Sequence, residues 1–395
     1  MIGPFSIARL PRIEFGAGAI DKLPGLLAGY GGRLLLVTGR RSFTESPAGE
    51  RFLARLAAGG LAWDHLRVSG EPSPALVDEA VAAYRGAGIA AVAGIGGGSV
   101  LDAAKAVAGL LKPGNSVLDH LEGVGPELPY RGPATPFVAV PTTAGTGSEA
   151  TKNAVLSARG PGGYKKSFRD EKLVAEWAVV DPDLLAGCPP ALIAADGMDA
   201  FTQLLESFVS ARANPMTDAL ARSGIMAVKD GLLAWHAGGE DAAAGRARMA
   251  YASLLSGICL AQTGLGSVHG IAAPLGALFP VPHGVACGTL VAEATAANIA
   301  AMKSREPENP ALPKYAEIGR RFAMQKGLNG DDARDFLVAT LRRWQEALAL
   351  PRLAACGIAA GDIPSIVAGS RGSSMKTNPV VLTDGEIAGI LAARL

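Results

Sequence analysis

The chain is poor in aromatic residues, which make up only 5% of its 395 positions, and it has no excess of charge of either sign. With 37 basic and 36 acidic residues its net charge is +1, so binding to nucleic acid is not expected. Ala, Leu, Val and Ile must therefore fill the interior. A hydrophobic fraction of 49% supplies a sizeable core and excludes a disordered chain.

Cysteine is also scarce: the chain has four, and none forms a C-x-x-C pair. This pattern indicates a reduced compartment, and we expect a cytoplasmic protein. The N-terminus, MIGPFSIARLPRIEFG, lacks the apolar core of a signal peptide. The 44 residues Met249–Ala292 lack Asp, Glu, Lys and Arg, but Pro, Gly, Gln and His interrupt them. We interpret them as buried interior and expect no membrane partner.

Short apolar runs alternate with helix-like segments in the first half of the chain. The predicted strands are Arg33–Thr38, Ala90–Ile95, Pro136–Val140 and Trp177–Val180. The predicted helices between them are Ala75–Arg85 and Ser99–Leu111. This alternation predicts βαβ units, and therefore an α/β domain with a Rossmann-like parallel sheet over residues 1–183.

The second half, residues 184–395, is dominated by long Ala- and Leu-rich segments and predicts an all-α domain. Its predicted helices are Pro190–Ser210, Pro215–Ala234, Gly245–Gln262, Gly284–Met302, Pro313–Phe322 and Asp331–Leu348.

Three consecutive glycines, Gly96, Gly97 and Gly98, separate a predicted strand from a predicted helix. We expect Ser99 to cap that helix, with Asp102 completing a capping-box-like pair. The N–H groups at a helix start favour an anion, most naturally a pyrophosphate. The spacing departs from the G-x-G-x-x-G fingerprint, because the last position is Ser99. A plain glycine-rich turn is the alternative.

A second polar loop follows the Pro136–Val140 strand and contains Thr142, Thr143, Thr146 and Ser148. Ligands of open α/β sheets bind at the carboxyl ends of the strands, where these hydroxyl groups would act as donors. A hydrophilic loop without a ligand is the alternative.

Two of the five histidines, His269 and His283, lie in the charge-free stretch. Asp199 and Gln203 are four residues apart in a predicted buried helix and so share a face. Aspartate is rarely buried without a charge partner or a metal. One carboxylate and two imidazoles are common ligands of Fe²⁺ or Zn²⁺, whereas the amide is unusual. Satisfied core histidines are the alternative.

Six segments, in this order, resemble the iron-containing (group III) alcohol dehydrogenases, relatives of dehydroquinate synthase and glycerol dehydrogenase. They are GGGSVLDAAK (96–105), PTTAGTGSEAT (141–151), KKSFRDEKLV…VVDP (165–182), GMDAFTQLLE (197–206), VHGIAAPLGALFPVPHGVA (268–286) and TNPVVLT (377–383). The resemblance implies a dehydroquinate synthase-like fold with a cleft between its domains. It also implies NAD(P)-dependent hydride transfer between a small alcohol and its aldehyde or ketone, in a homodimer or higher homo-oligomer.

The resemblance also assigns residues by position. Those expected to bind the cofactor are Gly39, Gly96, Gly97, Gly98, Ser99, Asp102, Thr142, Thr143, Thr146, Ser148 and Lys165. Those matching the four metal ligands are Asp199, Gln203, His269 and His283, of which Asp199, His269 and His283 form the expected catalytic centre. The family normally has His at the Gln203 position. It has a further His, associated with proton relay, where this chain has Ala273.

The cofactor preference is predicted from the end of the first strand. NAD-preferring relatives often have Asp at the Gly39 position, where it holds the ribose diol and repels a 2′-phosphate. Gly39, Arg40 and Arg41 instead offer room and positive charge, so NADP(H) is slightly favoured over NAD(H).

Three other functions remain open. The alternatives to the dehydrogenase are a metal-independent reductase of the same fold, a catalytically degenerate nucleotide-binding relative, and a dehydroquinate synthase-like lyase. The lyase would need cationic residues for a phosphorylated substrate, and the charge-free stretch argues against it.

Overall fold

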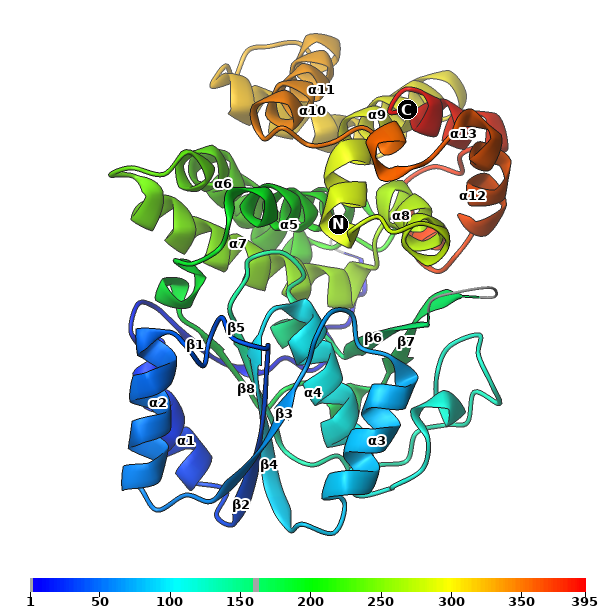
Figure 1. Cartoon of the computed structure of the whole chain (residues 1–395). Helices are drawn as coiled ribbons and strands as arrows, with labels where there is room; N and C mark the ends of the chain where they lie inside the picture. The colour runs from blue at the N-terminus through cyan, green and yellow to red at the C-terminus, as the bar shows by residue number, and fades with distance from the viewer. Residues whose placement is uncertain (1–2, 159–162) are drawn as a thin grey trace. The chain divides into compact units, whose positions relative to one another are not determined.

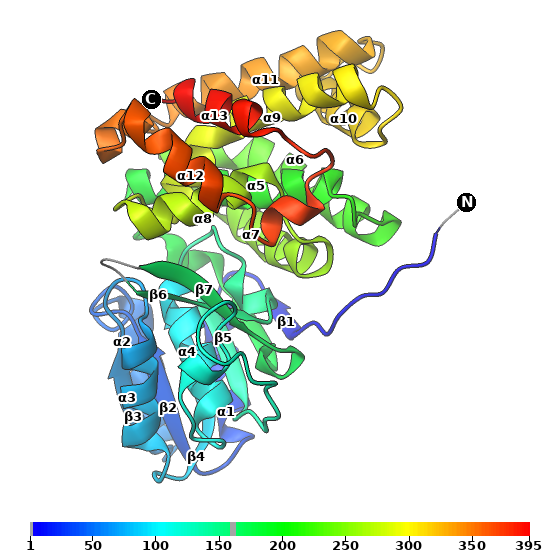
Figure 2. The same ribbon diagram turned by 90° about the vertical axis from the view of Figure 1, so that its right-hand side faces the viewer.

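The computed structural model describes residues 3–158 and 163–395, which Figures 1 and 2 show from two sides. The contacts divide the chain into two compact units. One is Ala8–Cys188, and the other is Pro189–Leu395 together with residues 3–7.

The first unit contains a six-stranded, all-parallel sheet with the strand order β1-β8-β5-β4-β2-β3. Its strands are β1 (Arg12–Phe15), β2 (Arg33–Thr38), β3 (Trp63–Arg67), β4 (Ile89–Gly96), β5 (Phe137–Pro141) and β8 (Trp177–Val180). A separate antiparallel hairpin is formed by β6 (Asn153–Ala158) and β7 (Tyr164–Arg169). The predicted parallel sheet is confirmed. The edge strands β1 and β3 and the hairpin were not predicted, because their partly exposed residues form no continuous apolar run.

Helices cover both faces of this sheet (Figure 1). They are α1 (Leu23–Ala28) and α2 (Pro47–Ala58) on one face, and α3 (Pro74–Tyr84) and α4 (Gly98–Leu110) on the other. In β2, Leu34 and Leu36 pack on the α1–α2 side, whereas Leu35 and Val37 pack on the α3–α4 side. Because both faces of β2 are buried, its sequence is apolar throughout rather than alternating.

The carboxyl ends of three central strands lie at one edge of the sheet. β2 is flanked by β3 and β4, so the order of the chain reverses there, which is where α/β sheets bind ligands. The register pairs Thr38 with Ile95 and Gly96 with Pro141, so β2, β4 and β5 end side by side. Gly39, the glycine-rich loop and the threonine-rich loop all leave the sheet at this edge.

The described residues of the second unit form helices and no strand. The helices are α5 (Pro190–Val209), α6 (Pro215–Ala237), α7 (Ala242–Thr263), α8 (Ser267–Leu278), α9 (His283–Arg305), α10 (Ala311–Ala323), α11 (Gly330–Ala347), α12 (Ile363–Gly369) and α13 (Asp384–Ala392). The predicted all-helical half is confirmed. α5 is buried along most of its length and packs against α6, α7 and α9. α8 was not predicted, because Pro274 lies inside it.

Two parts of this unit meet the length and hydropathy criteria of a membrane span. They are α9 alone and the pair α7–α8, which is bent by 99°. In α9, 72% of the most apolar window is buried inside the protein, which is the burial of a core helix.

The close approach of α9 to α5 provides a test of the packing. A Cβ atom at Gly284 would lie 2.6 Å from the carbonyl oxygen of Ala195, so Gly284→Ala must push the two helices apart. We expect this change to lower the free energy of unfolding by about 1–3 kcal/mol, as measured by urea denaturation. Gly389→Ala is the matched control, because that helical position in α13 has open space. It should leave stability unchanged or raise it slightly. Equal effects of the two substitutions would contradict the predicted clash.

Candidate functional site

Four potential metal ligands converge in the helical unit. Asp199 from α5, His269 from α8, and His283 and Cys287 from α9 each offer an atom within 4.8 Å of the others. Asp199 Oδ1 lies 3.2 Å from His269 Nε2 and 3.9 Å from His283 Nε2. Asp199, His269 and Cys287 are buried, and the His283 side chain is partly exposed, so the group can be reached from the His283 side.

Glu206, two turns after Asp199 in α5, holds one histidine in place. Its Oε2 atom lies 2.7 Å from His269 Nδ1, and its Oε1 accepts a 2.7 Å hydrogen bond from the backbone N–H of Val268. A carboxylate at Nδ1 fixes the ring and directs Nε2 toward Asp199. Carboxylates take this position behind metal-binding histidines.

The charges of the group are strongly coupled. Burial opposes the charged form of Asp199, but His283 and His269 outweigh it and hold the pKa of the carboxyl below its ordinary value. Burial likewise opposes a charged His269, but its coupling to Cys287, the negative charge of Glu206 and the hydrogen bond to Asp199 raise its pKa well above the ordinary value. Burial raises the pKa of Cys287 to about 12. The carboxylates of Asp199 and Glu206 therefore supply the negative charge beside the imidazoles, and the thiol of Cys287 is neutral.

These donors fit a divalent transition metal. A carboxylate oxygen, two imidazole nitrogens and a thiol sulfur are the ligand types that zinc and iron bind. Three separate helices hold them in place before any ion arrives. The sequence prediction that Asp199, His269 and His283 lie together is thus matched by the geometry of the fold.

Gln203 lies one turn after Asp199 on the same face of α5, but its side chain is hydrogen-bonded to α7. It is buried in α5, and its Oε1 accepts a 2.6 Å hydrogen bond from Ser256 Oγ of α7. The backbone carbonyl of Ser253 lies 2.8 Å from the same hydroxyl and shares its single proton. Gln203 thus anchors α5 to α7 through its carbonyl oxygen.

Two members of this group were missed by the sequence reasoning. Cys287 follows His283 by four residues, which places both on one face of α9, and that spacing could have identified it. No sequence pattern pointed to Glu206, because its role depends on α8 lying beside α5. Ala273, in place of a family histidine, is an exposed residue of α8.

The glycine-rich loop packs tightly against the threonine-rich loop. A Cβ atom at Gly98 would lie 2.8 Å from Thr146 Oγ1, and one at Gly97 would lie 3.2 Å from Thr143 Cγ2. The backbone N–H of Thr142 donates to the carbonyl of Gly96 at 3.0 Å. The two loops therefore form one surface, because Gly97 and Gly98 let the threonine side chains approach the start of α4 closely.

The expected helix cap was wrong. The N-cap of α4 is Gly97, and Ser99 is the second residue of the helix. Asp102 accepts hydrogen bonds from Ser148 Oγ at 2.5 Å and from the backbone N–H of Val155 at 3.1 Å. These tertiary partners compete successfully for the carboxylate that a local capping box would have used.

A buried ionisable cluster lies behind these loops. The Lys105 ammonium donates to Ser148, to Thr151 Oγ1 at 3.0 Å and to the carbonyl of Asn153 at 2.6 Å, so α4 is joined to the loop and the hairpin. Burial lowers the pKa of Lys105 to about 8 and raises the pKa of Glu149 to about 7. Burial also raises the pKa of Asp102. Ser148 and Asp102 are thus held within the protein by this cluster.

The two other predicted cofactor residues lie at different places in this unit. Lys165, in β7, forms a 2.7 Å ion pair with Glu71 Oε1. Gly39 directly follows β2, and the Thr38 hydroxyl donates to its carbonyl at 2.8 Å. Arg40 and Arg41 beyond it are exposed, and Arg41 lies 3.6 Å from Glu45.

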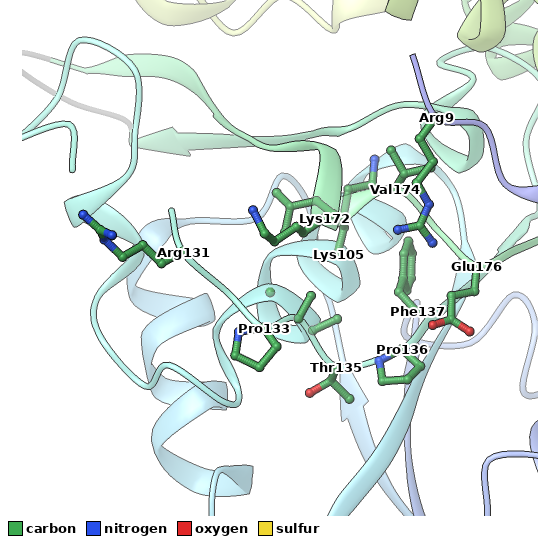
Figure 3. A pocket seen from close by; sticks show the side chains of 14 residues that line it. Arg9, Lys105, Arg131, Pro133, Thr135, Pro136, Phe137, Lys172, Val174 and Glu176 are labelled. Carbon is green, nitrogen blue, oxygen red and sulfur yellow. The ribbon is translucent and has the colours of Figure 1, made fainter. Parts of the chain in front are cut away.

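An open hollow of about 340 Å³ lies elsewhere in the first unit (Figure 3). Arg9, Arg131 and Lys172 line it, with Glu176 as the acidic member of its lining. Pro136 places it at the amino end of β5, the opposite end from the threonine-rich loop. It is therefore not formed by the residues predicted to bind the cofactor.

Comparisons with known proteins cover nearly the whole chain. Residues 11–182 match the family model described as iron-containing alcohol dehydrogenase. Residues 193–395 match the one described as Fe-containing alcohol dehydrogenase family, C-terminal.

Individual relatives agree with these models. Lactaldehyde reductase of Escherichia coli (strain K12) is 30% identical over 359 residues, covering 89% of each chain. NAD-dependent methanol dehydrogenase of Bacillus methanolicus is 30% identical over 387 residues, covering 96% of this chain and 97% of the relative. The solved structure of a 1,3-propanediol oxidoreductase is 30% identical, with a TM-score of 0.87 and full coverage of both chains. An alcohol dehydrogenase from Oenococcus oeni is 26% identical, with a TM-score of 0.88 over 99% of this chain and 100% of that chain.

The buried Glu149 predicts a pH-dependent stability. Its pKa is raised from an ordinary 4.5 to about 7, so between these values the unfolded chain ionises while the folded protein keeps the proton. Folding therefore becomes less favourable as pH rises, by an amount on the order of 3 kcal/mol that is complete above pH 7. Glu149→Gln removes this titration. We expect urea denaturation to show the variant gaining stability relative to the parent between pH 5 and pH 8. A difference that is the same at both pH values would contradict the shift.

Proposed function

Because the chain belongs to the iron-containing alcohol dehydrogenase family, we propose which of its residues carry out the family reaction. The predicted function is confirmed: the protein is an NAD(P)-dependent oxidoreductase that interconverts a small alcohol and its aldehyde or ketone. Its family uses a nicotinamide dinucleotide and a divalent metal. The residue roles, the metal and the choice between NAD and NADP are our proposals.

We assign the metal to the helical half, residues 184–395. Asp199, His269 and His283 would supply three ligands, and family position makes Gln203 the expected fourth. When bound, the cation supplies Lewis-acid chemistry at the substrate oxygen, while the nicotinamide donates or accepts hydride. The buried Asp199 carboxylate, 3.2 Å from His269 and 3.9 Å from His283, is the observation that carries this assignment.

We assign the dinucleotide to the α/β half, residues 1–183. The N–H groups at the start of α4 would bind the pyrophosphate, since Gly96, Gly97 and Gly98 allow it to approach the backbone. Ser99, Thr142, Thr143 and Thr146 would add donors. Ser148 and Asp102 would act indirectly by holding the threonine-rich loop on α4. Lys165 would approach the ribose on the nicotinamide side.

We propose a short, neutral substrate. The relatives named for lactaldehyde, methanol and 1,3-propanediol act on small molecules of this kind. Leu265–Leu278 contains no charged residue, which suits an apolar pocket. Because Ala273 cannot carry a proton, water or a ribose hydroxyl would do so. We also propose a cytoplasmic location, since the four cysteines are free. The resemblance to the family is the basis for proposing a homodimer or higher homo-oligomer.

Removing the Asp199 charge tests the metal assignment. Asp199→Asn keeps the size of the side chain but leaves the site without its carboxylate, so we expect metal content to fall. We expect kcat/KM to fall at least about 100-fold. Metal analysis of freshly purified protein and NAD(P)H oxidation with short aldehydes measure both. Circular dichroism checks that the variant is folded.

The alternatives give different results in the same assays. Turnover that survives chelation in the parent protein would establish a metal-independent reductase instead. Nucleotide binding without turnover of any aldehyde, with or without added Fe²⁺ or Zn²⁺, would establish a degenerate relative.

Arg40 tests the cofactor preference. A guanidinium beside a 2′-phosphate forms charge-assisted hydrogen bonds, so Arg40→Ala should lower kcat/KM for NADPH about tenfold and leave that for NADH unchanged. Gly39→Asp should act in the same direction by repelling the 2′-phosphate. Steady-state kinetics with both cofactors measure the ratio. A strong NADH preference in the parent protein, unaltered in Arg40→Ala, would defeat the proposal.

A further inference from the structure

We propose that Cys287, rather than Gln203, is the fourth metal ligand of this protein, and that the resulting Asp-His-His-Cys site prefers zinc to iron. The inference rests on the proposed function, because the metal is the one assigned above to Asp199, His269 and His283. It changes the chemistry of that metal: a thiolate stands where the resemblance led us to expect an amide or an imidazole.

Four of the six distances between the donor atoms are close to the edges of a tetrahedron around one ion, and all six are within 4.8 Å. Cys287 Sγ lies 3.6 Å from His269 Nε2 and 3.8 Å from His283 Nε2. Asp199 Oδ1 lies 3.2 Å and 3.9 Å from the same two nitrogens. Zinc bonds of about 2.1 Å to N or O and about 2.3 Å to S give tetrahedral edges of roughly 3.4 Å and roughly 3.6 Å. These four distances differ from the tetrahedral edges by at most about half an ångström.

The fold holds the sulfur in this position. His283 and Cys287 are one turn apart in α9, so their side chains leave the helix on the same side. The absence of a side chain at Gly284 lets this end of α9 approach the backbone of Ala195 in α5, the helix of Asp199. Cys287 is completely buried, so its sulfur reaches the other three donors and no solvent.

Gln203 is the competing candidate, and its hydrogen bond weakens its case. Only the carbonyl oxygen of an amide can bind a cation, and that atom accepts the 2.6 Å hydrogen bond from Ser256. The Ser253 carbonyl is the second acceptor within reach of that single hydroxyl proton. Coordination by Gln203 would compete with this link between α5 and α7, whereas coordination by Cys287 would leave it intact.

The charge and the soft sulfur of a Cys287 thiolate favour it over Gln203 as a ligand, and favour zinc over iron as the metal. A divalent cation deprotonates a coordinating thiol, so Asp199 and Cys287 together would neutralise its two positive charges. His269 and His283 would then bind as neutral imidazoles, with Glu206 holding His269 by its other nitrogen. Thiolates select zinc over harder ions. Four protein ligands still allow a substrate oxygen as a fifth, since catalytic zinc expands its coordination.

The chain offers a matched control in Cys259. This second buried cysteine, in α7 of the same unit, lies 3.7 Å from the backbone carbonyl of Thr217 and is not in the four-donor group. Cys259→Ala and Cys287→Ala therefore remove the same atom from equally buried positions. Cys287→Ser keeps nearly the size of the side chain and guards against a variant that fails to fold.

The experiment loads metal-free full-length protein with Co²⁺, whose bond to a thiolate produces a charge-transfer absorption in the near ultraviolet. We expect the band in the parent protein, in Cys259→Ala and in Gln203→Leu, and its loss in Cys287→Ala and Cys287→Ser. Competition with a chromophoric chelator should show zinc affinity falling at least about 100-fold in the Cys287 variants, and by much less in Gln203→Leu. After loading with equal Fe²⁺ and Zn²⁺ under argon, the zinc-to-iron ratio should fall in Cys287→Ser.

The outcomes separate this inference from the proposed function, because none of these measurements uses turnover. A parent protein without the band, or Gln203→Leu losing metal while Cys287→Ala keeps it, would overturn the assignment of Cys287 even in an active dehydrogenase. A thiolate band in a protein that reduces no aldehyde would support Cys287 and reject the proposed function. An unchanged zinc-to-iron ratio in Cys287→Ser would reject the zinc preference.

Discussion

The buried carboxylate of Asp199 is the constraint on which the helical unit depends. A charge removed from water is costly unless opposite charge or a cation lies beside it. In this protein two imidazoles do so, and their placement requires α5, α8 and α9 to meet at one point. Glu206 extends the same arrangement by fixing His269. The helices of this unit thus pack around a polar centre as well as an apolar one, and that centre is the part suited to binding a metal.

In the α/β unit, the surface proposed for the dinucleotide is built from glycine and threonine residues rather than from cationic side chains. At the edge where β2, β4 and β5 end, the threonine-rich loop packs on Gly97 and Gly98 at the start of α4, and its hydroxyl groups are partly accessible. The ammonium of Lys105 instead donates hydrogen bonds inside the protein, to Ser148, Thr151 and Asn153. It fixes the threonine-rich loop against α4, and so determines the shape of the surface rather than its charge.

The departures from the family pattern are concentrated around the metal site. Gln203, which stands where the family normally has His, is hydrogen-bonded to Ser256, and Ala273 stands where the family has a further His. Cys287 contributes a sulfur to the same site. A site with two negative ligands is a weaker Lewis acid than one with a single carboxylate and neutral imidazoles. The glycine-rich and threonine-rich loops proposed for the dinucleotide keep the motifs that resemble the family.

The sequence by itself determined the order of buried strands, the all-helical second half and the identity of most candidate residues. Apolar runs, glycines and the Asp199–Gln203 spacing are local signals that any fold must accommodate. It did not determine the partners of those residues. Asp102 bonds Ser148 instead of capping α4, Glu206 supports His269, and Cys287 joins the metal group. Only the tertiary structure decided these, because each depends on helices and loops distant in sequence meeting within a few ångströms, and a local pattern carries no information about that distance.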